Sequence, residues 1–525
     1  MEVVAPRARQ NARERAGAWT GAAAAAGGVF ALASSPTNFY VGLWLGMAGL
    51  AYSLEEPLAT RWAKGRLGGA GRGLAFGTVA NIVALRFVPD VVARFTPLPW
   101  AAGALALLLL AAAQGLRWLV AGVVREQLAR LGLASWAAFA AGVYGGTFVP
   151  AVFPWNPAGG ATPWPAMIQL ADVLGDRGVS LLMAATAGLL ASGVRLAREG
   201  RLARGAVLGG IAVAIPLATF EHGRFRIAEV EALRAEATST TVALVQPGTG
   251  AVLRWDPGSR RPILDRLTSL TRSAEHRGAT LTIWPEAAYP IAVGHASRRC
   301  PTGEWAVLPF GVRGPVLTGL ITSGAAGETF NSAAICKTDG TLTEPYDKIH
   351  LLWFGEAVPL ADQIPWIRRT FMRSGGLFPG EHGVVQEAGP VRAGVLNCFE
   401  DILSSAGREA MVGAPNLLVN VTNDAWFAGS AESEMHLRVA VMRAVEERRD
   451  LVRAVNLGPT TWVDAAGQVR GRYDSGLPGT LLAQPALLET PPTPFGRWGD
   501  APTALAVTLV VACWLAAQRA RRHRA

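Results

Sequence analysis

The sequence RAGVLNCFE at residues 392–400 places an apolar, β-type run directly before a cysteine and a glutamate. Two further motifs carry reactive side chains in a similar setting: Trp-Pro-Glu at 284–286 follows a β-type run, and Tyr-Asp-Lys lies at 346–348. Rigid strands of a layered α/β domain converge at their ends. The motifs are therefore expected to bring a carboxylate, an ammonium group and a thiol together.

The surrounding residues 221–500 have the mixed composition of a globular domain. Helices are expected at 260–276, where apolar residues recur at helical spacing, and at 431–449. Strands are expected at 241–245, 281–283, 316–321, 332–337, 392–396 and 417–421. Strands interleaved with helices and hairpins predict a layered α/β domain, and about 280 residues are enough to bury a substantial core.

The chain as a whole is 50% hydrophobic and 17% charged, too apolar for an ordinary soluble enzyme of 525 residues. Crossing a bilayer takes about 20 apolar residues. Runs near that length lie at 17–36, 38–54, 73–92, 99–123, 132–153, 178–194, 205–220 and 502–518. The expected organisation is a transmembrane domain of about seven helices at 1–220, a catalytic domain at 221–500, and a final transmembrane helix with a basic tail at 501–525.

Arginine and lysine clusters indicate the topology. They lie before the first apolar run, after the second, fourth and sixth, and after the last. All fall on one side of the membrane if seven spans precede the globular domain and one follows it. The positive-inside rule then predicts cytoplasmic termini and an extracytoplasmic domain. Because the net charge of +10 is explained in this way, no nucleic-acid partner is expected.

The four cysteines and seven histidines show no metal-ligand spacing, so neither a metal site nor a cofactor is expected. An extracytoplasmic compartment permits a disulfide between Cys300 and Cys336, and the sequence leaves that pairing open. Cys513 lies in the last apolar run and is expected to be a small hydrophobic residue there.

The reactive side chains of the motifs suit nucleophilic acyl transfer. A free thiol is mostly protonated at neutral pH, so a nucleophilic Cys398 needs a base or a cation beside it. Glu286 is the expected base, and Lys348 is expected to stabilise the thiolate and then the oxyanion of a tetrahedral intermediate. Taken singly, each residue also has a structural explanation, as a buried cysteine, a loop carboxylate or a turn lysine.

The combination resembles the nitrilase, or carbon–nitrogen hydrolase, superfamily. The resemblance rests on Trp-Pro-Glu and Tyr-Asp-Lys, on Phe-Gly-Glu at 354–356, Cys-Phe-Glu at 398–400 and Asn-Asp-Ala-Trp-Phe at 423–427. It implies an extracytoplasmic αββα sandwich with a catalytic triad of Glu286, Lys348 and Cys398. Seven spans before this domain and one after it resemble the apolipoprotein N-acyltransferase family of the bacterial inner membrane.

That resemblance implies a two-step reaction. Cys398 takes an acyl chain from a phospholipid, at sn-1 of phosphatidylethanolamine, and forms a thioester. The α-amine of the N-terminal diacylglyceryl-cysteine of an apolipoprotein then accepts the chain. The implied protein is a monomer in the bacterial inner membrane, with its catalytic domain on the periplasmic side.

Further residues are expected to support this chemistry. Glu356 is expected to pair with Lys348 or to orient it, and the remaining supporting residues are Glu400, Phe399 and Asn331. A substrate entrance that excludes water from the thioester is expected from Trp353, Phe354, Trp426 and Phe427, with core packing as an equal alternative for these aromatics. Asn397 and Phe399 stand where the family usually has Ile and Tyr, so the pocket is expected to differ in detail.

Two alternatives remain open. A membrane-tethered nitrilase-like amidase or hydrolase would transfer the acyl group to water and would need no lipoprotein acceptor. A membrane scaffold or transporter would carry an inactive sandwich domain. Few ionisable residues lie inside the apolar runs, Arg117 being the main case, which argues against a transport path. The complete set of base, cation and thiol argues against an inactive domain.

Overall fold

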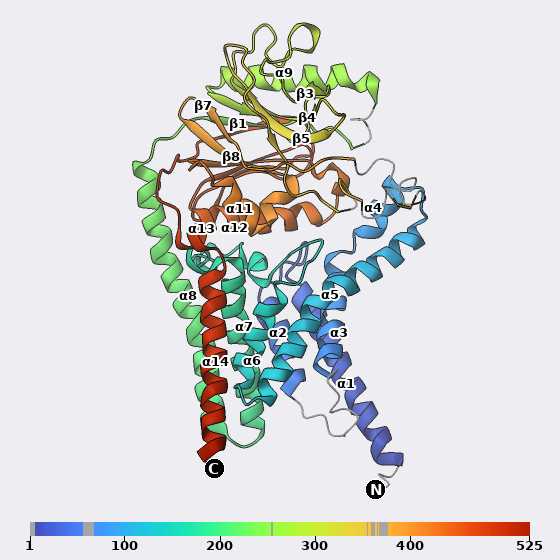
Figure 1. Cartoon of the computed structure of the whole chain (residues 1–525), viewed down its shortest axis with the longest axis vertical. Helices are drawn as coiled ribbons and strands as arrows, with labels where there is room; N and C mark the ends of the chain where they lie inside the picture. The colour runs from blue at the N-terminus through green and yellow to red at the C-terminus, as the bar shows by residue number, and fades with distance from the viewer. Residues whose placement is uncertain are drawn as a thin grey trace. The chain divides into compact units, whose positions relative to one another are not determined.

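The computed structural model describes residues 6–55, 68–251, 253, 256–353, 355–358, 363–364, 366 and 376–524. The chain divides into two compact units, Met1–Gly223 with Asp500–Ala525, and Arg224–Gly499. Each unit has its own architecture (Figure 1).

The first unit is helical. Its helices are α1 (Pro6–Ala31), α2 (Gly42–Glu55), α3 (Gly68–Ala84), α4 (Val88–Phe95), α5 (Trp100–Arg130), α6 (Ser135–Gly146), α7 (Ala171–Arg198), the greater part of α8 (Leu202–Glu236) and α14 (Ala501–Arg524). Among the described residues, α5, α7, α8 and α14 are long and apolar enough to cross a membrane, and the bent pair α3–α4 makes a fifth if it forms one span. The structure thus confirms several apolar helices in the N-terminal half, while the number of eight spans stays a prediction.

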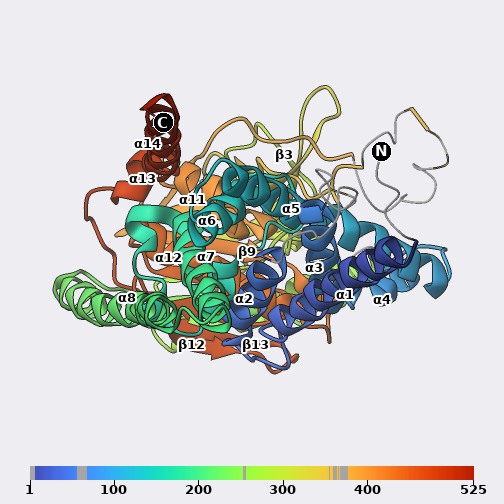
Figure 2. The same cartoon turned by 90° about the horizontal axis from the view of Figure 1, so that it is seen from below.

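Glycines allow these helices to approach closely. A Cβ added at Gly73 of α3 would overlap the backbone of Trp118 in α5, and one added at Gly122 of α5 would overlap the backbone of Gly69. Small residues at helix crossings are typical of membrane helices, because they let backbones meet. Seen along the helices, α1, α3 and α5 lie side by side (Figure 2).

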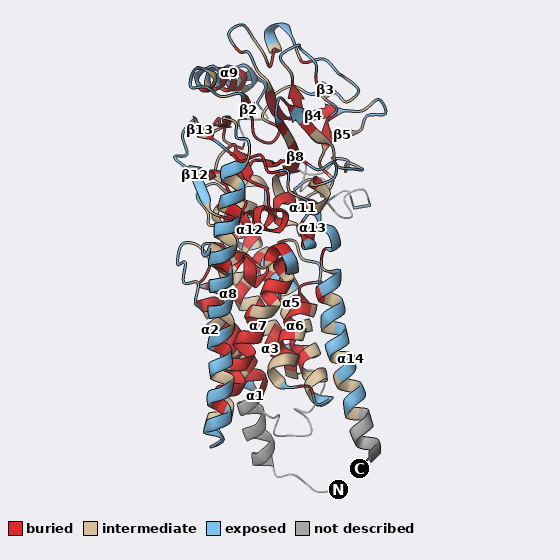
Figure 3. Cartoon of the chain, turned by 90° about the vertical axis from the view of Figure 1, so that its left-hand side faces the viewer, coloured by how far each residue is buried: buried red, intermediate tan, exposed pale blue. Residues whose placement is uncertain are grey.

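Two helices of this unit leave apolar side chains uncovered. Most of α7 is buried, whereas α8 and α14 are largely exposed (Figure 3). Exposed positions include Val213 and Leu217 on α8 and Leu509 and Val510 on α14. A helix that is apolar on its exposed face is expected in a lipid environment.

The second unit contains, within the described residues, a seven-stranded sheet and a six-stranded sheet. The first sheet consists of β1 (Val242–Gln246), β2 (Leu281–Ile283), β3 (Val293–Gly294), β4 (Val316–Ser323), β5 (Thr329–Cys336), β6 (Tyr346–Asp347) and β13 (Gly479–Ala483). The second consists of β7 (Val385–Ala388), β8 (Val391–Asn397), β9 (Leu417–Thr422), β10 (Leu451–Val455), β11 (Thr460–Val463) and β12 (Val469–Tyr473). Within them, β1 pairs in parallel with β2, and β8 pairs in parallel with β9.

The sheets pack face to face and helices cover their outer faces. Leu244 and Ile283 of the first sheet share a buried apolar core with Val395 and Val419 of the second. Helix α9 (Arg260–His276) packs on the first sheet, and α11 (Ser404–Ala410) and α12 (Glu432–Glu447) pack on the second (Figure 1). This is the helix–sheet–sheet–helix order expected for an αββα sandwich.

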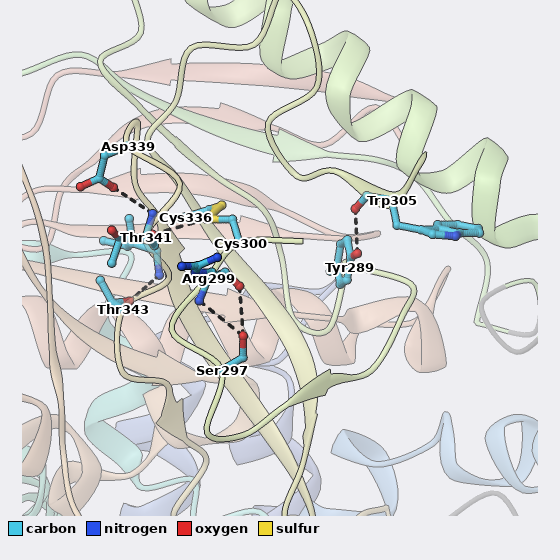
Figure 4. Close-up of a disulfide and its surroundings, with 10 residues drawn as sticks. Tyr289, Ser297, Arg299, Cys300, Trp305, Cys336, Asp339, Thr341 and Thr343 are labelled. Atoms are coloured by element: carbon cyan, nitrogen blue, oxygen red, sulfur yellow. Dashed lines mark hydrogen bonds between the residues drawn. A yellow bond between two sulfur atoms is a disulfide. The ribbon is translucent and has the colours of Figure 1, made fainter. Parts of the chain in front are cut away.

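A disulfide joins Cys300 to Cys336, the pair that the sequence left open (Figure 4). Cys336 ends β5, and Cys300 lies in the segment between β3 and β4. In the same region, Tyr289 donates its hydroxyl proton to the carbonyl oxygen of Trp305 at 2.8 Å. The segment that begins with the Trp-Pro-Glu motif is thereby tied to the first sheet.

Candidate active site

The reactive side chains of the motifs lie just beyond strand ends of the second unit. Glu286 follows β2, Lys348 follows β6, and Cys398 directly follows β8. The sandwich brings these distant segments together. Lys348 Nζ lies 3.6 Å from Glu286 Oε1, and the Cys398 thiol interacts electrostatically with both charged groups.

The segment that carries Glu286 is anchored on both sides. Trp284 is completely buried, and its indole N–H donates to Thr271 Oγ1 of α9 at 2.9 Å. On the other side the segment lies against Gly319 of β4, where an added Cβ would overlap backbone atoms of Pro285 and Ala287. Both contacts restrict where the carboxylate can point.

Asn331 of β5 links the two carboxylates of the site. Its Nδ2 donates to Glu286 Oε1 at 2.7 Å and to Glu356 Oε1 at 2.8 Å. Asn397 in turn donates from Nδ2 to Asn331 Oδ1 at 3.1 Å. The unusual neighbour of the cysteine therefore takes part in orienting the site.

Lys348 is only 1% exposed and lies between two carboxylates. Its Nζ is 2.6 Å from Glu356 Oε2, the closer of the two. Burial by itself would lower the pKa of Lys348, but the charges of Glu356 and Glu286 outweigh it and raise that pKa above its usual value. Burial likewise favours the neutral form of Glu356, but Lys348 prevails and lowers the pKa of that carboxyl. Both groups are therefore charged at neutral pH.

Cys398 has a left-handed backbone, with φ of 52°, at the first residue of the turn η6 (Cys398–Ile402). This conformation costs a residue other than glycine about 1–3 kcal/mol and is often found at functional sites. Removal of the thiol from water, together with the charge of Glu286, raises the pKa of Cys398 well above its usual value, and Lys348 opposes this. The thiol is therefore protonated at rest, and a thiolate forms there only if a base takes its proton.

Glu400 braces the turn that carries Cys398. It is fully buried and accepts hydrogen bonds from the backbone N–H groups of Asn397, Ile349 and His350 and from the hydroxyl of Tyr346. Burial raises the pKa of Glu400, and these donors limit the rise. The carboxyl group thus joins the turn at Cys398 to the chain around Lys348.

Known proteins match both units. A family model described as "Apolipoprotein N-acyltransferase N-terminal domain" matches residues 26–189, and one described as "Carbon-nitrogen hydrolase" matches residues 241–487. An apolipoprotein N-acyltransferase from Allorhizobium ampelinum is 30% identical over 87% of this chain and 87% of its own length. The chain belongs to the apolipoprotein N-acyltransferase family.

Other members of the apolipoprotein N-acyltransferase family match over shorter stretches. The relative from Brucella melitensis is 30% identical over 71% of this chain and 69% of its own length. For the relative from Geobacter metallireducens, 32% identical, the match covers 62% of this chain and 63% of that protein, slightly less than two thirds of its length. Among solved structures, an amidase from Nesterenkonia sp. is 19% identical, with a TM-score of 0.37, covering 52% of this chain and 97% of the amidase.

The aromatic residues expected at the substrate entrance of this apolipoprotein N-acyltransferase family member are spread over separate segments. Trp353 is 57% exposed. Trp426 and Phe427 are half-buried on the turn η7 (Asp424–Phe427). Phe399, which is expected to support the site, is half-buried beside the cysteine. Phe354 lies outside the described residues, so its place in the entrance stays a prediction.

Sequence reasoning missed a set of buried charged residues next to Cys398. They are Asp401, Asp424, Glu432, His436 and Arg453. Glu432 and His436 lie four residues apart on α12, but the other members come from separate segments and meet them only in space, so the sequence carried little signal for the set. Among the described residues, Asp424, Glu432 and His436 each place one potential ligand atom within 4.8 Å of the others.

Proposed function

We propose that the chain is a phospholipid:apolipoprotein N-acyltransferase that works through a thioester on Cys398. The observation that carries the catalytic part is the position of Lys348, whose Nζ lies 2.6 Å from Glu356 and 3.6 Å from Glu286 beside the thiol. A base, a cation and a nucleophile in one site are the groups that acyl transfer needs. The names of the relatives support the choice of acceptor.

In the first step Glu286 takes the proton of the Cys398 thiol. The thiolate attacks the ester carbonyl of a phospholipid, with phosphatidylethanolamine and its sn-1 chain as the proposed donor. Lys348 stabilises the oxyanion of the tetrahedral intermediate, an interaction that typically contributes about 3–4 kcal/mol. When the intermediate collapses, the ester C–O bond breaks and Glu286 returns its proton to the oxygen of the departing lysophospholipid.

In the second step the free α-amine of an N-terminal diacylglyceryl-cysteine attacks the thioester. Glu286 accepts a proton from the amine, and Lys348 again stabilises the oxyanion. The C–S bond then breaks, the proton passes to the sulfur, and an amide is released. The resting thiol is restored without any cofactor.

Glu356, Asn331 and Glu400 are proposed to act through other residues. Asn331 orients Glu286 by donating to its Oε1, and Glu356 keeps Lys348 charged and in place. Glu400 holds the turn that carries Cys398. None of these three needs to touch the substrate.

We propose a location in the bacterial inner membrane, with 1–220 and 501–525 forming eight spans and 221–500 lying in the periplasm. The Cys300–Cys336 disulfide supports this location, since disulfides persist in oxidising compartments. Exposed apolar residues on α8 and α14 support contact with lipid. In this topology both termini are cytoplasmic. The protein is also proposed to act as a monomer. The acyl entrance is proposed to be lined by Trp353, Phe354, Trp426 and Phe427, and Phe399 is proposed to support the site beside Cys398.

The test uses the purified full-length protein and a phospholipid with labelled acyl chains. We expect a labelled adduct on the protein that hydroxylamine removes, as it does a thioester. Cys398→Ala should form none, whereas Cys513→Ala should form as much as wild type. Absence of the adduct in wild type would rule out the thioester mechanism.

A diacylglyceryl-cysteine peptide then identifies the acceptor. We expect it to discharge the adduct and to become labelled at its α-amine. If the label is instead released as free fatty acid at the same rate with and without peptide, the chain is a membrane-tethered hydrolase, and the acyltransferase proposal is wrong.

A further inference from the structure

A cluster of buried ionisable side chains lies behind the nucleophile, and the proposed reaction uses none of them. No member is more than 5% exposed. They come from four segments and are Asp401 of η6, Asp424 of η7, Glu432 and His436 of α12, and Arg453 of β10. Buried charges are costly unless they are paired, so this cluster needs an explanation.

His436 is the centre of the cluster. Its Nε2 lies 2.7 Å from Asp401 Oδ1, and its Nδ1 lies 3.3 Å from Asp424 Oδ1. Since a carboxylate faces each ring nitrogen, both nitrogens carry a proton and the ring is a cation. Burial by itself would lower the pKa of His436, but Asp401 and Asp424 outweigh it and raise that pKa well above its usual value.

The positive and negative charges of the cluster, His436 included, balance one another. Arg453 donates from Nε to Asp401 Oδ2 at 2.9 Å, so two cations face the carboxylates of Asp401 and Asp424. Glu432 Oε1 is 4.0 Å from His436 Nδ1. Burial raises the pKa of Glu432 to about 8, which makes this residue neutral at pH 7. Two positive and two negative groups then remain.

The cluster reaches Cys398 by two routes. Asp401 belongs to the same turn η6 as the cysteine, so holding Asp401 also holds the turn. Asp424 accepts from Thr422 Oγ1 at 3.4 Å, and Thr422 is also hydrogen-bonded to the thiol. Gly458, with φ of 150°, leaves room for Asp424, since a Cβ there would lie 2.8 Å from its Oδ2.

We propose that His436 is a positioning residue for the acyl transfer, which clamps the turn of Cys398 through Asp401 and offsets the negative charge of Asp424 when the thiolate forms. The inference rests on Cys398 being the nucleophile of the proposed function. It goes beyond that function because it assigns a role to residues outside the Glu286, Lys348 and Glu356 group.

The proposal predicts that substitutions of His436 and of Asp424 change the pKa of Cys398 in opposite directions. Glu286 and Asp424 disfavour the thiolate, while Lys348 favours it and Thr422 bonds to it. Arg453, the other cation of the cluster, is stabilised in its charged form by the thiolate. Replacing His436 by a neutral residue removes a cation and should raise the pKa of Cys398, whereas replacing Asp424 should lower it.

The test measures thiol ionisation in the full-length protein, with Cys513→Ala as background so that Cys398 is the one free thiol. Iodoacetamide alkylation of Cys398 is followed by mass spectrometry over a pH series. His436→Gln should move the midpoint upward by about one pH unit and Asp424→Asn downward by about as much. The double variant should return near the background value. His276→Gln on α9 is the control and should not move it.

Acylation by labelled phospholipid provides the second measurement. At neutral pH, His436→Gln should slow the formation of the thioester about tenfold, since a shift of one unit leaves about a tenth of the thiolate. Raising the pH should restore the rate. If His436 merely supported folding, its substitution would lower the rates of alkylation and acylation at every pH and would lower the melting temperature in parallel.

Several results would overturn the proposal. One is that His436→Gln and Asp424→Asn move the alkylation midpoint in the same direction, and another is that neither moves it. A third is that a chelator shifts the wild-type profile, because Asp424, Glu432 and His436 would then hold a metal ion. Alkylation needs no lipid, so failure of the acyltransferase proposal would leave this test intact.

Discussion

At the scale of single residues, the site is organised by how buried charges are paired. Lys348 stays charged because two carboxylates outweigh its burial, and Glu356 stays charged because Lys348 is 2.6 Å away. Cys398 is the opposite case, since burial and Glu286 hold it in the neutral form. In the proposed mechanism, activation therefore depends on moving one proton from the thiol to a neighbouring carboxylate.

Lys348→Met should abolish most acyl transfer. The variant removes the group proposed to stabilise the oxyanion, so thioester formation should fall by about 10²–10³-fold. Single-turnover acylation with labelled phospholipid measures this. Lys337→Met, in the turn after β5, is the matched control and should keep the wild-type rate. Equal losses in both variants would contradict the assignment of Lys348.

Glu356→Gln should change how stability depends on pH. Although burial opposes it, Lys348 lowers the pKa of Glu356, so this carboxylate stabilises the fold above its unfolded pKa of about 4.3 and loses that effect as the pH falls through the lower folded value. The variant should therefore be less stable than wild type at neutral pH. The difference in melting temperature should shrink as the pH falls below about 4. A difference that stays constant over the pH series would contradict this.

At the scale of elements, strand ends set the position of each group and neighbouring elements set its orientation. The segment after β2 is fixed by Trp284 against α9 and by Gly319 of β4. The turn after β8 is fixed by Glu400, which accepts from the backbone of Asn397 and Ile349. Rigid strands thus deliver side chains that loops alone would not hold.

Gly319→Ala should move Glu286 by pushing on the backbone that carries it. The added Cβ would overlap backbone atoms of Pro285 and Ala287, so the segment must shift or the strand must strain. We expect a loss of about 1–3 kcal/mol in the free energy of unfolding and slower acylation. Gly294→Ala on β3 is the control, because an added Cβ there meets open space. Similar stability and acylation in both variants would contradict the role of Gly319.

At the scale of the whole molecule, the chain combines apolar helices with an α/β sandwich that contains a disulfide. The two units differ in what stabilises them. Glycine-mediated contacts bring the backbones of α3 and α5 together, whereas a shared apolar core holds the sheets of the second unit.

Breaking the disulfide should weaken the second unit. The bridge joins residues 36 positions apart, and closing a loop of this size typically stabilises a protein by about 2–4 kcal/mol. The variant with Cys300→Ala and Cys336→Ala should therefore melt at a lower temperature, and reductant should lower the melting temperature of wild type but not of this variant. If reductant leaves wild type unchanged, the bridge contributes no stability.

The proposed topology can be tested in spheroplasts with a membrane-impermeant maleimide. Asp339→Cys, in the exposed turn after β5, should be labelled from outside the cell. Arg201→Cys, between α7 and α8, should be labelled only after the membrane is permeabilised. Exchanged labelling of the two sites would place the second unit in the cytoplasm and contradict the proposal.

The sequence by itself determined what is encoded locally. Apolar periodicity predicted α9 with the bounds that the structure has, and it predicted β2 and most of β9, because backbone pattern depends on near neighbours. The motifs likewise predicted the groups Glu286, Lys348 and Cys398, since their chemistry belongs to the residue type, and their catalytic roles stay a prediction. Composition indicated several apolar helices, but length and apolarity alone leave the number of spans open.

Only the tertiary structure decided which of these groups are partners. Asn331 reaches both Glu286 and Glu356 because β5 lies beside β6 and next to the segment after β2. His436 meets Asp401 because α12 packs on the turn after β8, and no spacing along the chain records that contact. Which distant buried charges pair depends on how the sheets and helices pack, so the local sequence does not determine these pairs and the tertiary structure does.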